Sequence, residues 1–275
     1  MWPVLLLTCL TMVAFAANSL LTRLAFQTTG IDAASFTAIR IVSGAITLLL
    51  ISAASGQRLK TGTSGLLSAL LLFTYVAAFS FAYRHISTGD GALVLFAAAQ
   101  LMMISYGMAR GERTSIPGLA MALGGLVLFL SPGATTPPIG ATLLMALAGF
   151  AWGAFSLLGK QGSSPVADTA LSFLWAIPLA ALLLLLQPHS LQLDSTGTVY
   201  ALLSGSLASG VGYALWYWVR VRMTAITAGA VQLSVPVLSA LLGALVLDEA
   251  ITLKAALSAL IVLAGIAWVT ARTRR

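Results

Sequence analysis

The sequence is built of long, uninterrupted apolar runs separated by short polar segments. A helix needs about 20 apolar residues to cross the hydrocarbon core of a bilayer, and in lipid only helices or closed barrels satisfy the backbone. The runs have this length, and because they are continuous rather than alternating they predict helices. Ten spans are expected: Pro3 to Leu24, Phe36 to Ala54, Gly65 to Tyr83, Gly91 to Ala109, Ile116 to Leu130, Ile139 to Gly159, Val166 to Leu186, Val199 to Val219, Ile226 to Leu247 and Ala255 to Thr270.

The composition agrees with an all-α integral membrane protein whose main surroundings are the lipid bilayer. Hydrophobic residues make up 59% of the 275 positions and charged residues 8%, far from the roughly 25% charged residues of soluble domains. The net charge of +7 could suggest a nucleic-acid partner. However, the basic residues stand singly or in pairs at the ends of the spans, so membrane topology explains them and no nucleic-acid partner is expected.

The distribution of basic residues predicts that both termini are cytoplasmic. With that orientation the inner side holds ten of them: Arg58, Lys60, Arg110, Arg113, Lys160, Arg220, Arg222, Arg272, Arg274 and Arg275. The outer side holds four: Arg23, Arg40, Arg84 and Lys254. This split follows the positive-inside rule. A signal peptide ending near Ala14 to Ala16 is not expected, because the first run lacks a basic n-region.

The second half of the chain repeats landmarks of the first half. Ser19 to Arg23 ends the first span as Ser156 to Lys160 ends the sixth. Further matched pairs are Gly91 with Gly229, Glu112 with Glu249, and Gly125 with Gly265. The pattern predicts two units, residues 1–134 and 135–275. Since each unit has five helices, an odd number, the units enter the membrane from opposite sides. Such inverted repeats are typical of carriers with a midplane cavity.

Four segments carry a resemblance to a known family: Ala14 to Ser19 (AFAANS), Ala151 to Ser156 (AWGAFS), Val235 to Ala240 (VPVLSA), and Glu249 with the apolar span after it. In these the chain resembles the bacterial drug/metabolite transporter superfamily, with two EamA modules over essentially the whole chain. The resemblance implies export of small metabolites across the bacterial cytoplasmic (inner) membrane by alternating access. It also implies a cavity walled by spans one, three, four, six, eight and nine.

A narrower likeness concerns the substrate. Tyr213 to Trp216 followed by Pro236 to Ser239 is similar to aromatic amino-acid exporters of the YddG type. This implies neutral or aromatic amino acids as substrates. Other members of the superfamily move purines, sugars or drugs, and these alternatives stay open, as does a channel.

Polar and aromatic groups at membrane depth are the candidates for solute binding. They share helical faces in spans one, three and eight, and amides occur in spans four and nine. The candidates are Phe15, Asn18, Tyr75, Phe79, Tyr83, Gln100, Trp152, Tyr213, Trp216, Tyr217, Gln232 and Ser239. Pro236 is a candidate hinge, although packing alone would also tolerate it. An interhelical hydrogen bond is the alternative role of Asn18, and an interfacial aromatic belt that of Tyr83.

The remaining chemistry of the chain argues against an enzyme. His85 and His189, the two histidines, fall at span boundaries, and neither has a serine and carboxylate arranged around it. Cys9 is the one cysteine, so we expect no intramolecular disulfide, metal or cofactor. No Asp or Glu lies well inside a predicted span, which favours movement of the solute down its own gradient. A monomer or a homodimer is expected, with spans five and ten outside the cavity.

Overall fold

The chain forms helices throughout the part that the structure describes. The computed structural model describes residues 2–57, 59, 64–110, 115–130, 137–158, 164–187, 191–222 and 231–272. The helices are α1 (Trp2–Thr28), α2 (Ala33–Ala54), α3 (Ser64–Tyr83), α4 (Thr88–Ala109), α5 (Ile116–Leu130), α6 (Ile139–Leu158), α7 (Pro165–Leu186), α8 (Ser195–Leu203), η3 (Ser204–Val211), α9 (Gly212–Arg220), α11 (Ser234–Leu247) and α12 (Leu253–Arg272).

Seven helical segments are long and apolar enough to cross a membrane: α1, α2, α3, α4, α6, α7 and the continuous segment Ser195–Arg220. The helices α5, α11 and α12 contain shorter apolar stretches. The expected ends of the first eight spans agree with the helices to within four residues. In the ninth span, α11 begins at Ser234, and residues 226–230, including the landmark Gly229, lie outside the described residues. The landmarks Glu112 and Lys160 also lie outside them.

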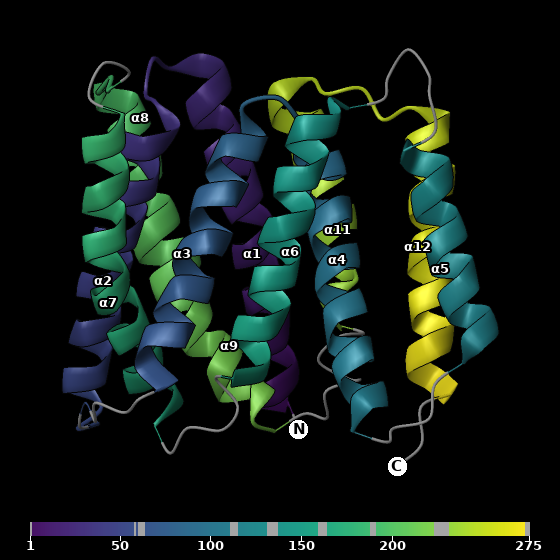
Figure 1. Ribbon diagram of the computed structural model, residues 1–275, viewed down its shortest axis with the longest axis horizontal. Coiled ribbons are helices and arrows are strands. Elements are labelled where there is room, and N and C mark those ends of the chain that lie inside the picture. Colours follow the sequence, from purple (N-terminus) through teal and green to yellow (C-terminus); the bar gives the residue numbers. More distant parts are fainter. Residues whose placement is uncertain are drawn as a thin grey trace.

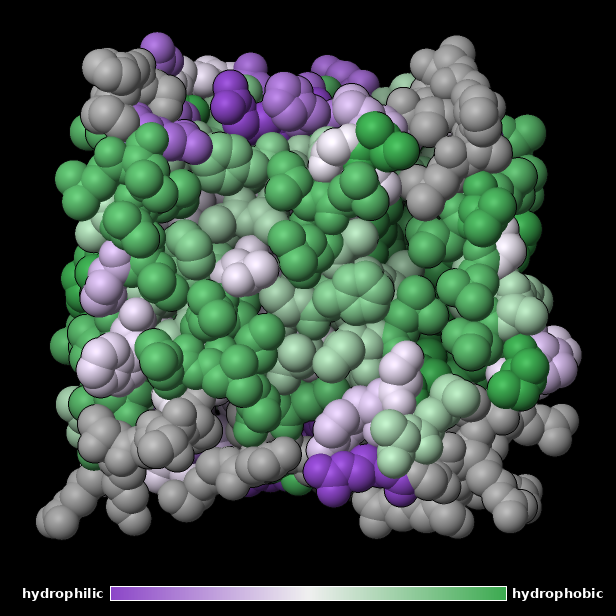
Figure 2. Space-filling view, viewed as in Figure 1, coloured by the Kyte–Doolittle hydropathy of each residue, from purple (hydrophilic) through white to green (hydrophobic). Residues whose placement is uncertain are grey.

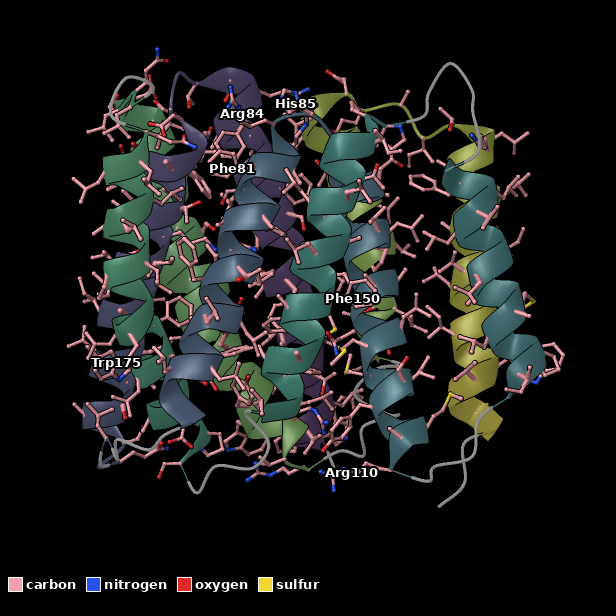
Figure 3. All side chains as sticks on the ribbon, viewed as in Figure 1. Phe81, Arg84, His85, Arg110, Phe150 and Trp175 are labelled. Atoms are coloured by element: carbon pink, nitrogen blue, oxygen red, sulfur yellow. The ribbon has the colours of Figure 1, made fainter. Side chains whose placement is uncertain are left out.

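The helices run up and down between two polar faces (Figure 1). We call the face where α1 begins and α12 ends the lower face, and the opposite one the upper face. Figure 2 shows an apolar belt between them. Arg84 and His85 lie at the upper edge and Arg110 at the lower edge (Figure 3). This arrangement is that of a multi-pass membrane protein, because the apolar belt has lipid as its natural solvent.

Acidic residues begin two of the helices. The Asp32 carboxylate accepts hydrogen bonds from the backbone N–H groups of Ala34 and Ser35 at the start of α2. Asp194 accepts from Gly197 at the start of α8. Such caps satisfy N–H groups that have no partner within the helix, which accounts for carboxylates at the ends of these spans.

Two arginines that the sequence assigned to the outer side lie within helices instead. Arg23 belongs to α1, which continues to Thr28. Arg40 stands seven residues into α2 and is fully buried. At 1.5 Å per residue it lies about 10 Å along the helix axis. The bundle therefore encloses Arg40, which a count of charges along the sequence does not show, and the orientation in the membrane stays a prediction.

Small residues let the helices approach closely around α1, which contacts α3, α4, α8, η3, α9 and α11. The closest approach of α6 to α4 is at Gly149, where an added Cβ would overlap the Leu95 carbonyl oxygen and lie 2.8 Å from the Ala98 Cβ. Any larger residue at 149 would push these two helices apart.

We predict that Gly149→Ala destabilises the bundle by about 1–3 kcal/mol, the usual cost of overpacking. Gly140→Ala, in the same helix, is the matched control, because nothing lies within 4 Å of its added Cβ. Thermal unfolding of the purified protein in detergent measures both. A melting temperature for Gly149→Ala equal to that of the control would contradict the close packing of α4 on α6.

Candidate functional site

Aromatic rings from α1, α3, α6 and α9 meet inside the bundle. The Phe15 ring centroid lies 5.4 Å from that of Trp152, 5.9 Å from that of Tyr213 and 5.8 Å from that of Trp216, all in edge-on geometry. Trp152 is also 5.1 Å from Tyr213. Edge-on and tilted pairs at these separations are favourable beyond the area they bury. Phe15 therefore connects the first helix to α6 and α9 of the second half.

A second set of rings extends the cluster along α3. Tyr75 lies 5.3 Å from Trp152 and 5.5 Å from Phe79, and Phe79 lies 4.6 Å from Tyr83. These side chains are all buried. The alternative role of Tyr83, in an interfacial aromatic belt, does not fit its position. Its side chain is buried, and its hydroxyl donates to the Thr88 carbonyl oxygen at 3.2 Å.

The cluster surrounds a small internal space, which we call the central space. Its lining comes from α1, α3, α4, α6 and α9: Phe15, Asn18, Ser19, Tyr75, Phe79, Leu95, Phe96, Trp152 and Tyr213. Its volume is about 10 Å³, which is room for one water molecule at most. A larger solute can be held here only after the rings have moved apart.

Two amide side chains fix the polar edge of the cluster. The Trp152 Nε1–H donates to the Gln232 Oε1 at 3.1 Å, and the Ser204 hydroxyl donates to the Asn18 Oδ1 at 2.6 Å. The first bond joins α6 to Gln232, 80 positions further along the chain, and the second joins α1 to η3, 186 positions further along. Because an unsatisfied polar group is costly in an apolar interior, these bonds hold their helices in register.

Arg40 lies behind Tyr75. Its Nη2 donates to the Tyr75 hydroxyl at 2.9 Å, and its Nε donates to the Ser209 hydroxyl at 3.1 Å. The guanidinium carbon lies 4.9 Å from the Phe79 ring centroid and 5.3 Å from that of Tyr75. A cation over a ring face is attracted by the quadrupole of the ring. Both rings line the central space, so this charge stands next to it.

An ion pair closes the upper end of the site. The Arg23 Nε lies 3.1 Å from the Glu249 Oε1, and Arg23 Nη1 donates to the carbonyl oxygens of Tyr83 and Arg84. The second carboxylate oxygen of Glu249 accepts the Thr88 backbone N–H at 2.7 Å. The network thus joins α1, the α3–α4 connection and the α11–α12 connection.

Comparison with known proteins identifies the family. Residues 139–271 match the model of the EamA-like transporter family. A Pseudomonas aeruginosa protein of uncharacterized function is 49% identical over 270 residues, which is 97% of this chain and 94% of that one. The chain belongs to the EamA-like transporter family.

Two further comparisons agree. An uncharacterized transporter of Archaeoglobus fulgidus is 24% identical over 213 residues, covering 72% of this chain and 73% of its own. A solved crystal structure superposes with a TM-score of 0.68 at 20% identity, covering 95% of this chain and 98% of that chain. The latter shows the same fold. Membership of the EamA-like family points to membrane transport of small molecules.

The structure brings most of the predicted site residues of this transporter together. Six line the central space: Phe15, Asn18, Tyr75, Phe79, Trp152 and Tyr213. Tyr83, Trp216 and Gln232 contact lining residues, and Tyr217 contacts the cluster through Phe155. Gln100 and Ser239 are buried in α4 and α11 but do not line the space. Their roles in binding stay predictions.

Pro236 occupies a different position from the one expected. It is the third residue of α11, in the first turn, where a backbone N–H has no partner within the helix. A turn at Leu233 precedes α11. The role of Pro236 as a hinge stays a prediction.

Sequence reasoning missed Arg40, its partner Ser209 and the Arg23–Glu249 pair. Arg40 carried one signal, a basic residue well inside an apolar run. The ion pair carried none, because its members are 226 positions apart.

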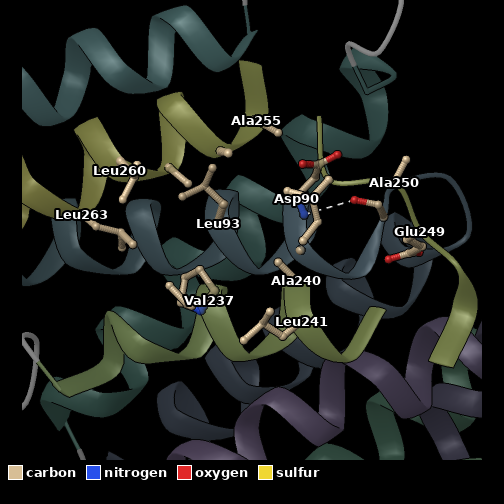
Figure 4. A pocket seen from close by; sticks show the side chains of 16 residues that line it. Asp90, Leu93, Val237, Ala240, Leu241, Glu249, Ala250, Ala255, Leu260 and Leu263 are labelled. Atoms are coloured by element: carbon tan, nitrogen blue, oxygen red, sulfur yellow. Dashed lines mark hydrogen bonds between the residues drawn. The ribbon is translucent and has the colours of Figure 1, made fainter. Parts of the chain in front are cut away.

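Two other hollows lie away from the aromatic cluster. An apolar groove of about 270 Å³ runs between α4, α11 and α12, with Asp90 and Glu249 at one end (Figure 4). A pocket of about 620 Å³ at the upper face is bordered by Phe26, Asp32 and Arg84. The groove is lined almost entirely by aliphatic side chains, so it offers a polar solute few partners.

Replacing Gln232 by Leu should leave the buried Trp152 N–H without an acceptor. We expect a coupling energy of about 1 kcal/mol between Gln232→Leu and Trp152→Phe, within the range of hydrogen bonds in membrane proteins. Unfolding of the single and double variants in mixed micelles measures it. Ser239→Ala is the control, because the Ser239 hydroxyl is buried without a partner; it should combine additively with Trp152→Phe. Additivity of Gln232→Leu with Trp152→Phe would show that the bond contributes nothing.

Proposed function

We propose that this transporter exports small metabolites, most specifically neutral or aromatic amino acids, across the bacterial inner membrane. In the proposal, residues 1–134 and 135–275 are inverted repeats that open the central space to either side in turn. The single observation that carries the proposal is the aromatic cluster, whose rings come from both halves and enclose one shared space.

Equivalent positions of the two halves supply the rings. Phe15 and Trp152 are 137 positions apart, close to the offset of the sequence landmarks, and Tyr75 and Tyr213 are 138 positions apart. In each pair the first residue comes from the first half and the second from the second half, and all four rings belong to one cluster. A binding site on the axis that relates two inverted halves would have this composition.

The pattern of helix contacts also supports a two-fold relation. In the repeat, α1 would correspond to α6, α2 to α7, α3 to the α8–α9 segment, α4 to α11 and α5 to α12. A two-fold relation then allows a helix to contact its own counterpart, and three such contacts occur: α2 with α7, α4 with α11 and α5 with α12. The contact of α3 with α6 has its counterpart in α1 with the α8–α9 segment, and that of α4 with α6 in α1 with α11. The contacts that the first half makes with the second are thus matched by equivalent contacts of the second half with the first.

The chemistry of the site favours a solute with a flat or apolar body and a few polar groups. Aromatic side chains provide stacking surfaces, and the amides of Asn18 and Gln232 provide donors and acceptors at their edge. Amino acids with neutral side chains fit this set. Purines, sugars and drugs are the alternatives that a transport assay must separate.

The proposed orientation places the lower face in the cytoplasm, where the described arginines Arg110, Arg220 and Arg222 lie near helix ends. The Arg23–Glu249 network would then close the outer side. The pair formed by α5 and α12 contacts the other helices little, which leaves it available to face lipid or a second copy in a homodimer.

We expect reconstituted protein to show saturable counterflow of labelled amino acids, screened against purines and sugars. Trp216→Ala or Tyr213→Ala should lower the flux at least tenfold, because each removes a ring of the cluster. Trp175→Ala is the matched control: Trp175 is 49% exposed on the outside of α7 (Figure 3) and should keep wild-type flux. Unchanged flux in both cluster variants would remove the aromatic site, and flux that does not saturate would favour a channel.

Breaking the ion pair should open the upper face. Glu249→Gln loses the charge that Arg23 faces, so we expect a cysteine placed at Ser19 in a Cys9→Ser background to react several-fold faster with a membrane-impermeant thiol reagent. The measurement is the labelling rate in whole cells. Asp194→Asn is the control, because Asp194 caps α8 away from the network. Equal labelling of all three proteins would show that the pair does not close this side.

A further inference from the structure

Arg40 is a buried cation whose side-chain contacts among the described residues are with neutral groups. Its side chain is fully buried in α2, and its guanidinium contacts the hydroxyls of Ser209 and Tyr75 and two aromatic rings. Arg23, in contrast, is paired with the carboxylate of Glu249. A charged group in a membrane interior is costly unless it is paired, and an intramembrane arginine is by default a functional candidate.

The guanidinium keeps hydrogen-bonding capacity. It has five N–H donors, and the structure shows bonds from Nε and Nη2, whereas the buried Nη1 has no hydrogen-bond partner among the residues that the structure describes. Neutral hydroxyls and ring faces stabilise the cation only in part. The planar fork of Arg matches the two oxygens of a carboxylate better than it matches single hydroxyls.

The position of Arg40 is fixed by the helix opposite. At Gly205 in η3 an added Cβ would overlap the Arg40 carbonyl oxygen and the Ser43 hydroxyl, so η3 lies directly against the backbone of α2 here. Ser209, which binds the Arg40 Nε, belongs to the same π-helical segment. Single π-helical turns occur frequently at functional sites. The π-helical segment places the Ser209 hydroxyl against the guanidinium.

The repeat does not account for this charge. At the offset of 137 or 138 positions that relates the rings of the two halves, Arg40 corresponds to Ile177 or Pro178, both uncharged. The rings are thus shared by both halves, whereas the buried cation occurs in one of them. A feature that served only the packing of the repeated helices would be expected in both.

We infer that Arg40 is the anion-binding group of the transporter and that its solutes carry a carboxylate. The inference rests on the proposed function and narrows it to carboxylate-bearing solutes with an apolar or aromatic body. When the rings separate, the carboxylate binds the free Nη1–H and competes with the Tyr75 hydroxyl for Nη2, while the body of the solute stacks on the ring cluster. Neutral sugars and amines lack the group that Arg40 binds.

The test compares two probes that differ only in charge, 3-phenylpropanoate and 3-phenylpropanamide. Their binding to the purified protein in lipid nanodiscs is followed by the fluorescence of the tryptophans, two of which lie in the cluster. The wild type should bind the carboxylate at least tenfold more tightly than the amide. Arg40→Gln should abolish this preference by weakening the carboxylate alone, and Arg40→Lys, which keeps the charge but not the fork, should retain part of it.

Arg220→Gln is the matched control, because Arg220 is also fully buried but lies at the lower end of α9; it should keep the preference for the carboxylate. Sodium sulfate is added to show that a free inorganic anion does not reproduce the signal of the carboxylate. The inference is overturned if the wild type binds the amide as tightly, if it binds neither probe, or if Arg40→Gln keeps the preference.

Flux in proteoliposomes separates failure of the inference from failure of the proposed function. Carrier-type flux of an uncharged solute that is equal in the wild type and in Arg40→Gln supports a transporter and overturns the role of Arg40. Carboxylate-dependent binding without flux of any labelled solute supports Arg40 and removes the proposed transport of metabolites. Size-exclusion profiles and helical circular dichroism show whether Arg40→Gln is folded. If it is not, the loss of part of the carboxylate preference in Arg40→Lys is the test.

Discussion

The backbone of this protein has no water to bond to within the bilayer, and that constraint determines almost everything else. Every N–H and C=O in the hydrocarbon must be satisfied by the chain itself, so the described regular structure is helical and the non-helical residues lie mainly in the connections. Lipid tails are as apolar as the side chains, so apolar burial does little to hold the helices together. Close contacts between small residues, such as Gly149 against α4, and a few interhelical hydrogen bonds provide that cohesion instead.

The same constraint makes the interior polar groups informative. Asn18 is joined to Ser204, Gln232 to Trp152, and Arg40 to Ser209 and Tyr75, and each bond crosses from one helix to another. All of them surround the ring cluster rather than the lipid-facing side of the bundle. Polar groups at this depth are expensive, so their concentration around one small space marks it as the part of the molecule where specificity resides.

The sequence predicted the helices well because length and hydropathy decide them. It also predicted the ring residues, since Tyr75 and Phe79, or Tyr213 and Tyr217, recur at one turn on the same helical face. The sequence did not show which residues on different helices form hydrogen bonds with each other. Gln232 and Trp152 are 80 positions apart and Arg40 and Ser209 are 169 apart, and nothing local to either residue indicates the other. Tyr83 shows the consequence: it is the last residue of its span in the sequence, but the neighbouring helices enclose its side chain.

The closed conformation is held by interactions that a change of conformation can break and that contacts with a solute can replace. At the upper face a largely buried ion pair, with side chains 15% and 12% exposed, joins the connections, and water would hydrate both charges once this face opened. Around the central space each ring pair contributes about 0.5–1.5 kcal/mol, which is comparable with what a stacked solute would supply in exchange. Two conformations that differ by a few kcal/mol can be shifted by a ligand that binds one of them better. A carboxylate at Arg40 would supply such a difference, because it would satisfy the Nη1–H that has no partner among the described residues of the closed structure and could reach it only when the rings are apart.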